Sequence, residues 1–270
     1  MTADIDARVS FDTERMMIEV DMSGLRFETS GQVNAFYDRI EELIAESGEE
    51  LWFFLLNFSG FRIEEDAWYA HHKRGKALNL AHSMGTVRYD VSDETRRQLE
   101  RTAKTEAFDP NLFADHDAAL ERIDALPSKR TVKKTLSSGY TEAELSRRIS
   151  FDDGAEVMDV DFSNFTFYNS ADVHAFYDHI EVRLEATGMR WFFLVNMENC
   201  KIYDEAWVSY AMRGKALNQK WSMGSVRYAT GSDTEETIRM RAESQSFRPN
   251  VRVTREDALA RLDEMKREMA

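Results

Sequence analysis

The sequence predicts an α/β protein of two homologous domains, each a mostly parallel sheet with an N-terminal hairpin and about four helices. The first observation is an internal repeat: Ala35–Asp38 (AFYD) returns as Ala175–Asp178, and Arg74–Asn79 (RGKALN) returns as Arg213–Asn218. The second is that each copy alternates strand-like apolar runs with helix-like segments, the order of a parallel α/β layer. Because an offset of 139–140 residues is too long for a solenoid unit, each copy is expected to be a domain.

The two copies also set the expected boundaries. They place the first domain at residues 1–126 and the second at 145–270, with a linker at 127–144 that contains Ser137-Ser138-Gly139. The linker carries a small basic cluster, for which solvation is the ordinary expectation. Its members are Lys129, Arg130, Lys133 and Lys134.

Each copy is expected to open with a hairpin and a helix. In the first copy, strand-like stretches at 7–11 and 16–21 flank turn residues. Ser30 then offers an N-cap to a helix with apolar residues at 3/4 spacing, and Gly48 stops it. The second copy repeats this pattern.

The middle of each copy predicts a central strand and a long helix. Residues 51–58 form an apolar run typical of a strand that is covered on both faces. In the next segment residues recur at steps of three and four, which predicts one helical face against a core. They are Trp68, His71, Gly75, Leu78 and His82. Gly85 is expected to end this helix before a short strand at 86–89.

The last third of each copy predicts a polar helix, at 95–105 in the first copy, and then a Pro-Asn break. A closing helix is expected at 118–126 and at 257–265, with a short strand at 251–253 before the second of these.

Composition limits the classes of function. The formal net charge is −14, with 43% hydrophobic and 31% charged residues, as in soluble globular proteins. Nucleic acid is disfavoured as a partner, because duplex binding requires a basic face. We expect no signal peptide, no membrane span and a cytoplasmic location. Cys200, whose counterpart is Phe61, is the single cysteine, so no intramolecular disulfide can form.

The order of elements resembles the STAS-like fold, in particular the bacterial branch similar to anti-sigma-factor antagonists and related to CRAL-TRIO lipid-binding domains. The residues that carry the resemblance are the hairpin and first helix, the strand-to-helix passage FFLLNFSGFRIEEDAW, the strand VRY and the ending VRVTREDALARL. The resemblance covers nearly all of both copies. It implies two STAS-like domains that form an intramolecular pseudo-dimer.

One feature of that family is missing from the sequence. The resemblance implies a phosphorylatable serine just after the central strand, but Glu64-Glu65-Asp66 and Tyr203-Asp204-Glu205 stand there. Ser59 is nearby, and Glu198 takes its place in the second copy. The sequence therefore does not predict the phosphorylation switch of that family, and acidic residues suit the first turn of a helix on electrostatic grounds alone.

The histidines do not predict a metal centre. His71 and His82 share a helical face but are roughly 16 Å apart at 1.5 Å rise per residue, too far to bind one ion. Their counterparts Tyr210 and Trp221 are aromatic, which favours packing positions. We therefore expect no metal site and no cofactor.

Basic residues kept in both copies of an acidic chain are the candidate binding residues. They are Arg74, Lys76 and Arg88 in the first copy and Arg213, Lys215 and Arg227 in the second. The functional interpretation is a pair of sites for an anion or an acidic partner, because guanidinium groups suit carboxylates and phosphates. The structural interpretation is ion pairing within the chain, and we expect exposure beside a concave surface if the arginines bind.

Motifs of the common nucleophile, phosphate-loop, dinucleotide and zinc-protease types are absent from the sequence. We expect a non-enzymatic regulatory or binding protein whose partner is another protein or a small anionic or apolar ligand. It would be a monomer with pseudo-twofold symmetry or a weak homo-oligomer. The alternatives are a carrier of lipid-like molecules and an enzyme with its site at the domain junction.

Overall fold

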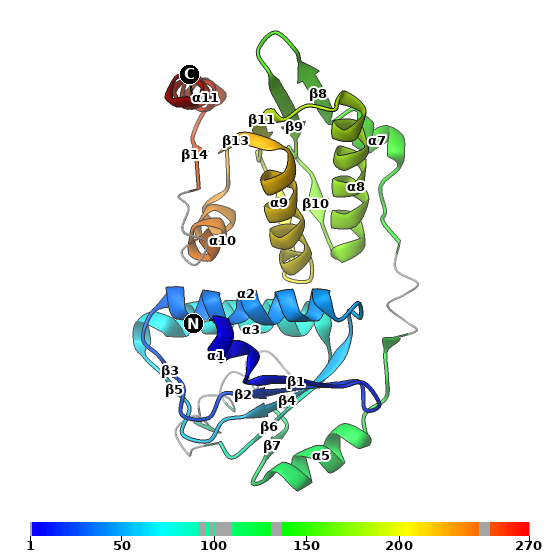
Figure 1. Ribbon diagram of the computed structural model, residues 1–270, viewed down its shortest axis with the longest axis vertical. Coiled ribbons are helices and arrows are strands. Elements are labelled where there is room, and N and C mark those ends of the chain that lie inside the picture. Colours follow the sequence, from blue (N-terminus) through cyan, green and yellow to red (C-terminus); the bar gives the residue numbers. More distant parts are fainter. Residues whose placement is uncertain are drawn as a thin grey trace. The chain divides into compact units, whose positions relative to one another are not determined.

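The computed structural model describes residues 2–91, 96–97, 100, 110–130, 137–242 and 249–269. The chain divides into two compact units, Met1–Thr135 and Leu136–Ala270. The division falls inside the predicted linker (Figure 1).

The first unit is built on a five-stranded sheet with the strand order β1-β2-β4-β6-β7. Its strands are β1 Val9–Asp12, β2 Met17–Asp21, β4 Trp52–Asn57, β6 Ser83–Tyr89 and β7 Leu112–Phe113. β1 pairs antiparallel with β2 as the predicted hairpin, and the other neighbouring strands pair in parallel.

The second unit repeats this arrangement with the strand order β8-β9-β11-β13-β14. Its strands are β8 Ile149–Asp152, β9 Val157–Asp161, β11 Trp191–Asn196, β13 Ser222–Tyr228 and β14 Val251–Arg252. Again the first pair is antiparallel and the rest are parallel. The predicted fold class, two similar α/β halves with mostly parallel sheets, is confirmed.

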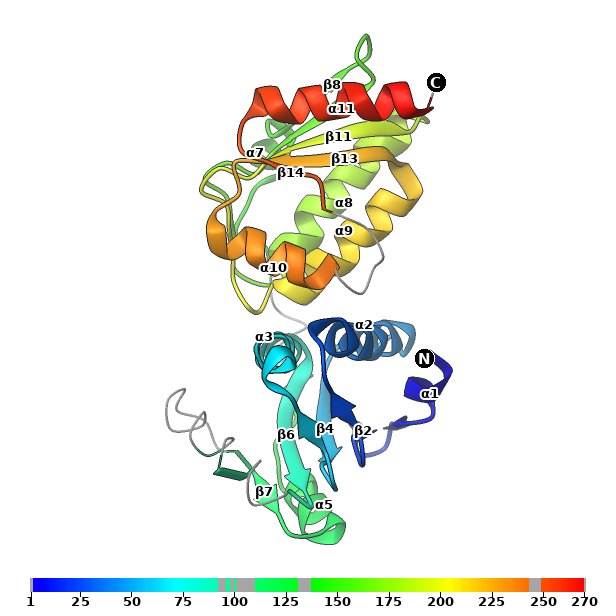
Figure 2. The ribbon, with the colours of Figure 1, turned by 90° about the vertical axis from the view of Figure 1, so that its left-hand side faces the viewer.

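The helices cover both faces of each sheet (Figures 1 and 2). In the first unit α2 Ser30–Glu46 and α3 Glu65–His82 lie on one face, and α5 His116–Asp124 packs on the other. In the second unit the matching helices are α8 Ser170–Thr187, α9 Trp207–Trp221 and α11 Arg255–Met269, while α10 Ser232–Ala242 lies beside α9. Successive parallel strands are added in one direction, and right-handed crossovers then place their helices on one face.

This strand order has a consequence for ligand binding. Open α/β sheets usually bind ligands at a topological switch point, where the direction of strand addition reverses. Neither described sheet contains such a reversal, since β2, β4, β6 and β7 follow one another across the first sheet and their counterparts do so across the second. The described sheets therefore lack the usual ligand-binding crevice of open α/β folds.

The central strands are buried on both faces, as their unbroken apolar sequence predicts. Phe53 and Leu55 of β4 form a core cluster with Val87 of β6 and Ile123 of α5. Phe54 points to the opposite side and is 2% exposed. The alternation of side chains along a strand explains this division.

Short elements that the sequence pattern did not predict complete the units. They are the helices α1 Thr2–Asp6 and α7 Glu142–Ser146 and the two-stranded parallel sheets of β3 Arg26–Phe27 with β5 Arg62–Ile63 and of β10 Thr166–Phe167 with β12 Lys201–Ile202. Within the described parts of the chain no helix is both long and apolar enough to cross a membrane.

Two predicted helix ends are wrong by a few residues. The N-cap of α2 is Thr29, which forms a capping box with Gln32, and not Ser30. Helix α3 ends at His82 and continues into β6 without a loop, so Gly85 lies inside the strand. Gly85 does not stop the helix; a Cβ there would lie 2.6 Å from Leu126, so its lack of a side chain lets the segment after α5 pack on β6.

In the second unit the predicted helical stripe is correct at Trp207, Tyr210 and Leu217, and in the first unit it is correct at Leu78, while the rest of the buried face of α3 is rotated by one residue. Trp207, Tyr210 and Leu217 are buried, whereas Trp68 is half-buried. The buried positions of α3 include a run one residue earlier at the same 3/4 spacing: Ala67, Ala70, Arg74, Ala77 and Ala81. Alanines allow close helix packing but carry little hydrophobic weight in a sequence pattern, so the apolar pattern marked only the edge of the buried face, at Leu78.

The predicted linker is partly packed. Arg130 donates from Nε to the Leu51 carbonyl oxygen at 3.0 Å, and its guanidinium lies 4.7 Å from the centre of the Trp52 ring. This cation–π contact corrects the expectation that the cluster is simply solvated. Lys133, Lys134 and most of the predicted helix at 95–105 lie outside the described residues.

Candidate functional site

Arg74, the first candidate binding residue, is structural. Its side chain is fully buried, and its Nη2 lies 2.8 Å from Asp38 Oδ1 and 3.0 Å from Glu41 Oε1 on α2. Its Nη1 donates to Asn34 Oδ1 at 2.9 Å. Arg74 therefore lacks the exposure expected of a binding arginine and follows the structural interpretation, ion pairing within the chain. The helix rotation described above explains why, since position 74 faces α2.

Arg213 makes the equivalent contacts in the second unit. It lies 2.6 Å from Asp178 and 2.9 Å from Glu181, both on α8, and its side chain is 23% exposed. Because both edges of the guanidinium are already engaged, Arg213 has little left to offer a ligand. The matched pair Arg74 and Arg213 ties the two long helices of each unit together.

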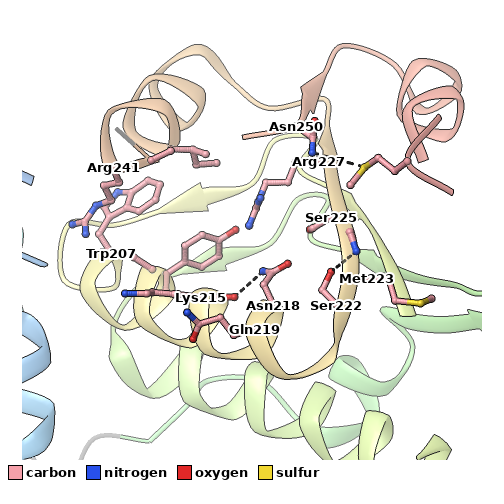
Figure 3. A pocket seen from close by; sticks show the side chains of 17 residues that line it. Trp207, Lys215, Asn218, Gln219, Ser222, Met223, Ser225, Arg227, Arg241 and Asn250 are labelled. Atoms are coloured by element: carbon pink, nitrogen blue, oxygen red, sulfur yellow. Dashed lines mark hydrogen bonds between the residues drawn. The ribbon is translucent and has the colours of Figure 1, made fainter. Parts of the chain in front are cut away.

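The other four predicted residues line cavities. Lys215 and Arg227 line a cavity of about 400 Å³ between α9, α10 and β13, here called the second cavity (Figure 3). Lys76 and Arg88 line a cavity of about 790 Å³ beside α3 and β6, the first cavity. The structure thus separates the six candidates into two helix ties and four cavity residues.

The two cavities occupy equivalent positions in the repeat. Six polar or aromatic lining pairs have the same identity at an offset of 139 residues: Trp68/Trp207, Lys76/Lys215, Asn79/Asn218, Ser83/Ser222, Arg88/Arg227 and Asn111/Asn250. Thr86 and Ser225 form a further pair in which both residues keep a hydroxyl. Because these lining residues are retained in two diverged copies, we infer that the two cavities are equivalent sites.

The charge of the lining differs from that of the whole chain. The chain has 49 acidic and 35 basic residues, yet among the described lining residues of the two cavities there is no Asp or Glu. The first cavity is lined by Lys76, Arg88 and Lys129, and the second by Lys215, Arg227 and Arg241. The described lining of each cavity therefore carries a net positive charge, although the protein as a whole is acidic.

The strand arginine of the second unit has one unpaired buried atom, although its guanidinium also interacts with the Tyr210 hydroxyl. Arg227 points from β13 into the space beside α9 (Figure 3), and its Nε is buried without a hydrogen-bond partner among the described residues. The buried hydroxyl of Ser225 also lacks a partner there. Such atoms usually carry a free-energy cost unless another group pairs with them.

Arg88 has a similar environment in the first unit. Its Nη1 donates to the Pro110 carbonyl oxygen at 3.0 Å, and no described carboxylate lies within ion-pairing distance. Burial lowers the pKa of Arg88 to about 10. Since that value is still well above neutral pH, the guanidinium keeps its charge and lacks a counterion from the described chain.

A β-bulge shapes the start of each lining strand. The register shifts between Trp52 and Phe53 opposite Ser83–Gly85, and it shifts in the same way between Trp191 and Phe192 opposite Ser222–Gly224. An extra residue at this point turns neighbouring side chains, which is a common device beside functional sites. The serine, the bulged methionine and the glycine all line the cavity in both units.

The inner end of the first cavity contains a histidine held by a tyrosine. The Tyr37 hydroxyl lies 3.3 Å from His71 Nδ1. Burial, together with the charge of Arg88, lowers the pKa of His71 to about 3. The imidazole is therefore neutral near pH 7 and a weak proton acceptor.

Among the described residues no group of three His, Cys, Asp or Glu side chains is placed to hold a metal ion.

Several cavity residues were not selected from the sequence. The amides of Asn79 and Asn111, the hydroxyl of Thr86 and the linker residue Lys129 all line the first cavity. Apart from Lys129, each of them has a matching or chemically similar residue 139 positions later, so the repeat carried the signal. Asn79, Asn111 and Thr86 carry no charge, so the retained basic residues did not point to them.

Comparisons with known proteins do not add to this assignment. The chain matches no family model, no curated protein and no solved structure. The site is therefore defined by its geometry and by the agreement between the two units.

Proposed function

We propose that the protein is a non-enzymatic binding protein in which each unit binds a small organic anion, in the first and the second cavity. The observation that carries this proposal is the exclusion of described carboxylates from both cavities in a chain of net charge −14. Arg88 and Arg227 point to places that an anion can fill.

Electrostatics favours an anion over a neutral ligand. A buried guanidinium without a counterion has lost hydration, and an incoming carboxylate or phosphate oxygen can form charge-assisted hydrogen bonds with it. Ser225 Oγ and the Nε of Arg227 are buried in the same cavity and are available for such bonds. Attraction between opposite charges is stronger in this partly dry space than at the surface.

Size and lining favour an organic ligand over an inorganic ion. A volume of about 400 Å³ is in the range of small-molecule sites, and Trp207, Met223 and Ile238 contribute apolar walls. The indole of Trp207 lies under the Arg241 guanidinium, 5.9 Å from the ring centre (Figure 3). A ligand with an anionic head and an apolar or planar body suits this combination.

Binding is favoured over catalysis because the lining lacks a competent base. The described lining has no carboxylate, and the low pKa of His71 makes it a poor proton acceptor. The STAS-like assignment, a bacterial origin, a cytoplasmic location and a protein partner that senses the ligand remain parts of this proposal. The order of elements along each copy supports the STAS-like part of the proposal.

The test uses hexanoate, benzoate and phenyl phosphate as probes. Isothermal titration of the intact protein should give up to two sites, and saturating probe should raise the melting temperature. At a hundred times Kd the gain in unfolding free energy is about 2.7 kcal/mol. Replacing both cavity arginines (Arg88→Gln with Arg227→Gln) should weaken binding about tenfold or more, the usual worth of a charged hydrogen bond.

Arg213→Gln is the matched control. Arg213 is also an arginine that is retained in both copies, but it is paired with Asp178 and Glu181 of α8 and does not line the cavity. The control variant should leave probe affinity unchanged while lowering stability. Equal loss of affinity in the control and in the cavity variant, or no binding of any probe to the wild-type protein, would refute the proposed function.

A further inference from the structure

The two cavities differ in depth. The first cavity reaches past the polar residues to apolar side chains between α2, α3 and the sheet, among them Val20, Ile40, Phe54 and Leu56. In the second unit the counterparts Val160, Ile180, Phe193 and Val195 do not line the second cavity. They line a separate space of only about 20 Å³. The inner chamber that is open in the first unit is nearly filled in the second.

Tyr210 is the largest of the uncharged side chains that border both spaces of the second unit. It lines both of them, together with Gly214, Asn218, Ser225 and Arg227. The counterparts of these residues in the first unit, including His71, all line the single large cavity. In the first unit, with His71 at this position, the inner chamber is continuous with the rest of the first cavity. In the second unit, with Tyr210 at the equivalent position, the inner chamber is separate from the second cavity.

Tyr210 is held firmly in its dividing position. Its ring contacts those of Phe162, Phe167, Tyr177 and Trp207, with centroid separations of 5.5–6.3 Å. Its hydroxyl donates to Met197 Sδ at 3.8 Å. Four ring neighbours leave it little room to swing aside for a ligand.

The first unit has smaller side chains at two of these positions. His71 replaces Tyr210, and Met22 replaces Phe162. His71 has a smaller ring without a phenol oxygen, and methionine is flexible enough to adapt to a ligand. Both residues line the first cavity.

From this difference, and resting on the proposed function, we infer that the two units bind anions of different apolar length. Arg88 or Arg227 holds the anionic head in either case. The first unit accepts a long apolar tail in its inner chamber, whereas Tyr210 and Phe162 limit the second unit to ligands with a shorter apolar part. His71/Tyr210 and Met22/Phe162 are the specificity-determining positions.

The experiment measures Kd for the straight-chain carboxylates from butanoate to dodecanoate, below their micelle concentrations, by isothermal titration. Arg227→Gln leaves the first unit as the competent site, and Arg88→Gln leaves the second. In Arg227→Gln affinity should rise about fourfold for each added methylene along the series, the expected gain for a buried CH₂. In the Arg88→Gln protein the affinity should stop rising at a shorter carboxylate than in the Arg227→Gln protein.

Exchanging the dividing residues should exchange the selectivity. In the Arg227→Gln protein, adding His71→Tyr and Met22→Phe should make the rise stop early. In the Arg88→Gln protein, Tyr210→His with Phe162→Met should let it continue. The first exchange introduces larger side chains into the inner chamber, and the second introduces smaller ones. If one of the two variants fails to fold, the other still tests the inference.

The outcomes separate the two proposals. If no carboxylate or other anionic probe binds the wild-type protein, the proposed function fails and this inference with it. If carboxylates bind but both single-site proteins show the same chain-length dependence, or the folded exchange variants leave it unchanged, the inference is overturned while the proposed function stands.

Discussion

Arg74 and Arg88 show how residue position decides the role of the same side chain. Arg74 belongs to the face of α3 that meets α2, where Asp38 and Glu41 neutralise it. Arg88 belongs to a strand whose alternate side chains face a cavity without described carboxylates. Their partners Arg213 and Arg227 repeat the contrast. Both pairs are arginines that are retained in both copies, so the sequence does not distinguish them. Their roles differ because their neighbours in the folded units differ.

At the same scale, the low pKa of His71 predicts sensitivity to mild acid. The pKa is about 3 in the folded protein and 6.5 ordinarily, because burial disfavours the charged imidazole. The unfolded chain therefore binds more protons between these pH values, and stability is full above pH 6.5 and falls as the pH is lowered toward 3. The loss is at most about 1.4 kcal/mol for each pH unit in that window.

Replacing this histidine by a neutral residue, His71→Gln, should flatten that part of the pH dependence in urea unfolding measured from pH 7 to pH 4.5. The wild-type protein, measured in the same buffers, gives the reference slope. An unchanged slope in His71→Gln would show that the imidazole is not the source.

At the scale of elements, the helix α3 and its counterpart α9 combine a packing role and a site role. One face of α3 packs through alanines and Arg74, and a neighbouring face carries Lys76 and Asn79 into the first cavity. Gly75 stands between these faces in mid-helix, where glycine usually costs about 1 kcal/mol relative to alanine. A Cβ at this position would lie 3.0 Å from the Tyr37 hydroxyl oxygen, so the glycine makes room for the tyrosine.

This geometry predicts coupling between Gly75 and Tyr37. In a Tyr37→Phe background, Gly75→Ala should stabilise the protein by about 0.5–1 kcal/mol, because the helix gains alanine and the crowding oxygen is gone. In the wild-type background the gain should vanish or reverse. Denaturant unfolding of the four proteins in this double-mutant cycle gives the coupling.

The second unit supplies the comparison for this cycle. The corresponding distance from Gly214 to the Tyr177 hydroxyl is 3.3 Å, so the coupling there should be smaller. If Gly75→Ala stabilises both backgrounds equally, crowding by Tyr37 is not the reason for the glycine.

At the scale of the whole molecule, the duplication gives two units that each hold a complete core. In the first unit a cluster around Phe53, Leu55 and Val87 is closed by Ile123, and in the second Phe192, Leu194 and Val226 are closed by Leu262. Each sheet is covered on both faces by helices of its own unit. Domains of this size bury enough surface to fold without help.

Residues 1–130 and 137–270, expressed separately, should therefore each give a cooperative thermal transition and a folded circular dichroism spectrum. A matched truncation, residues 1–80, lacks β6, β7 and α5 and should remain unfolded, because it leaves an edge of β4 and a whole sheet face uncovered. If either long fragment behaves like that truncation, the units depend on one another for stability.

The sequence alone determined the duplication, the α/β class, the order of the main strands and helices and the residues that recur in both copies. These follow from local periodicity and from identity at a fixed offset, which need no knowledge of contacts. Only the tertiary structure decided the rotation of α3, because its packing face consists of alanines and one neutralised arginine that a hydrophobic pattern cannot distinguish from surface. It also decided that Arg88 and Arg227 line cavities while Arg74 and Arg213 do not, since burial and ion pairing depend on side chains that are distant in the chain.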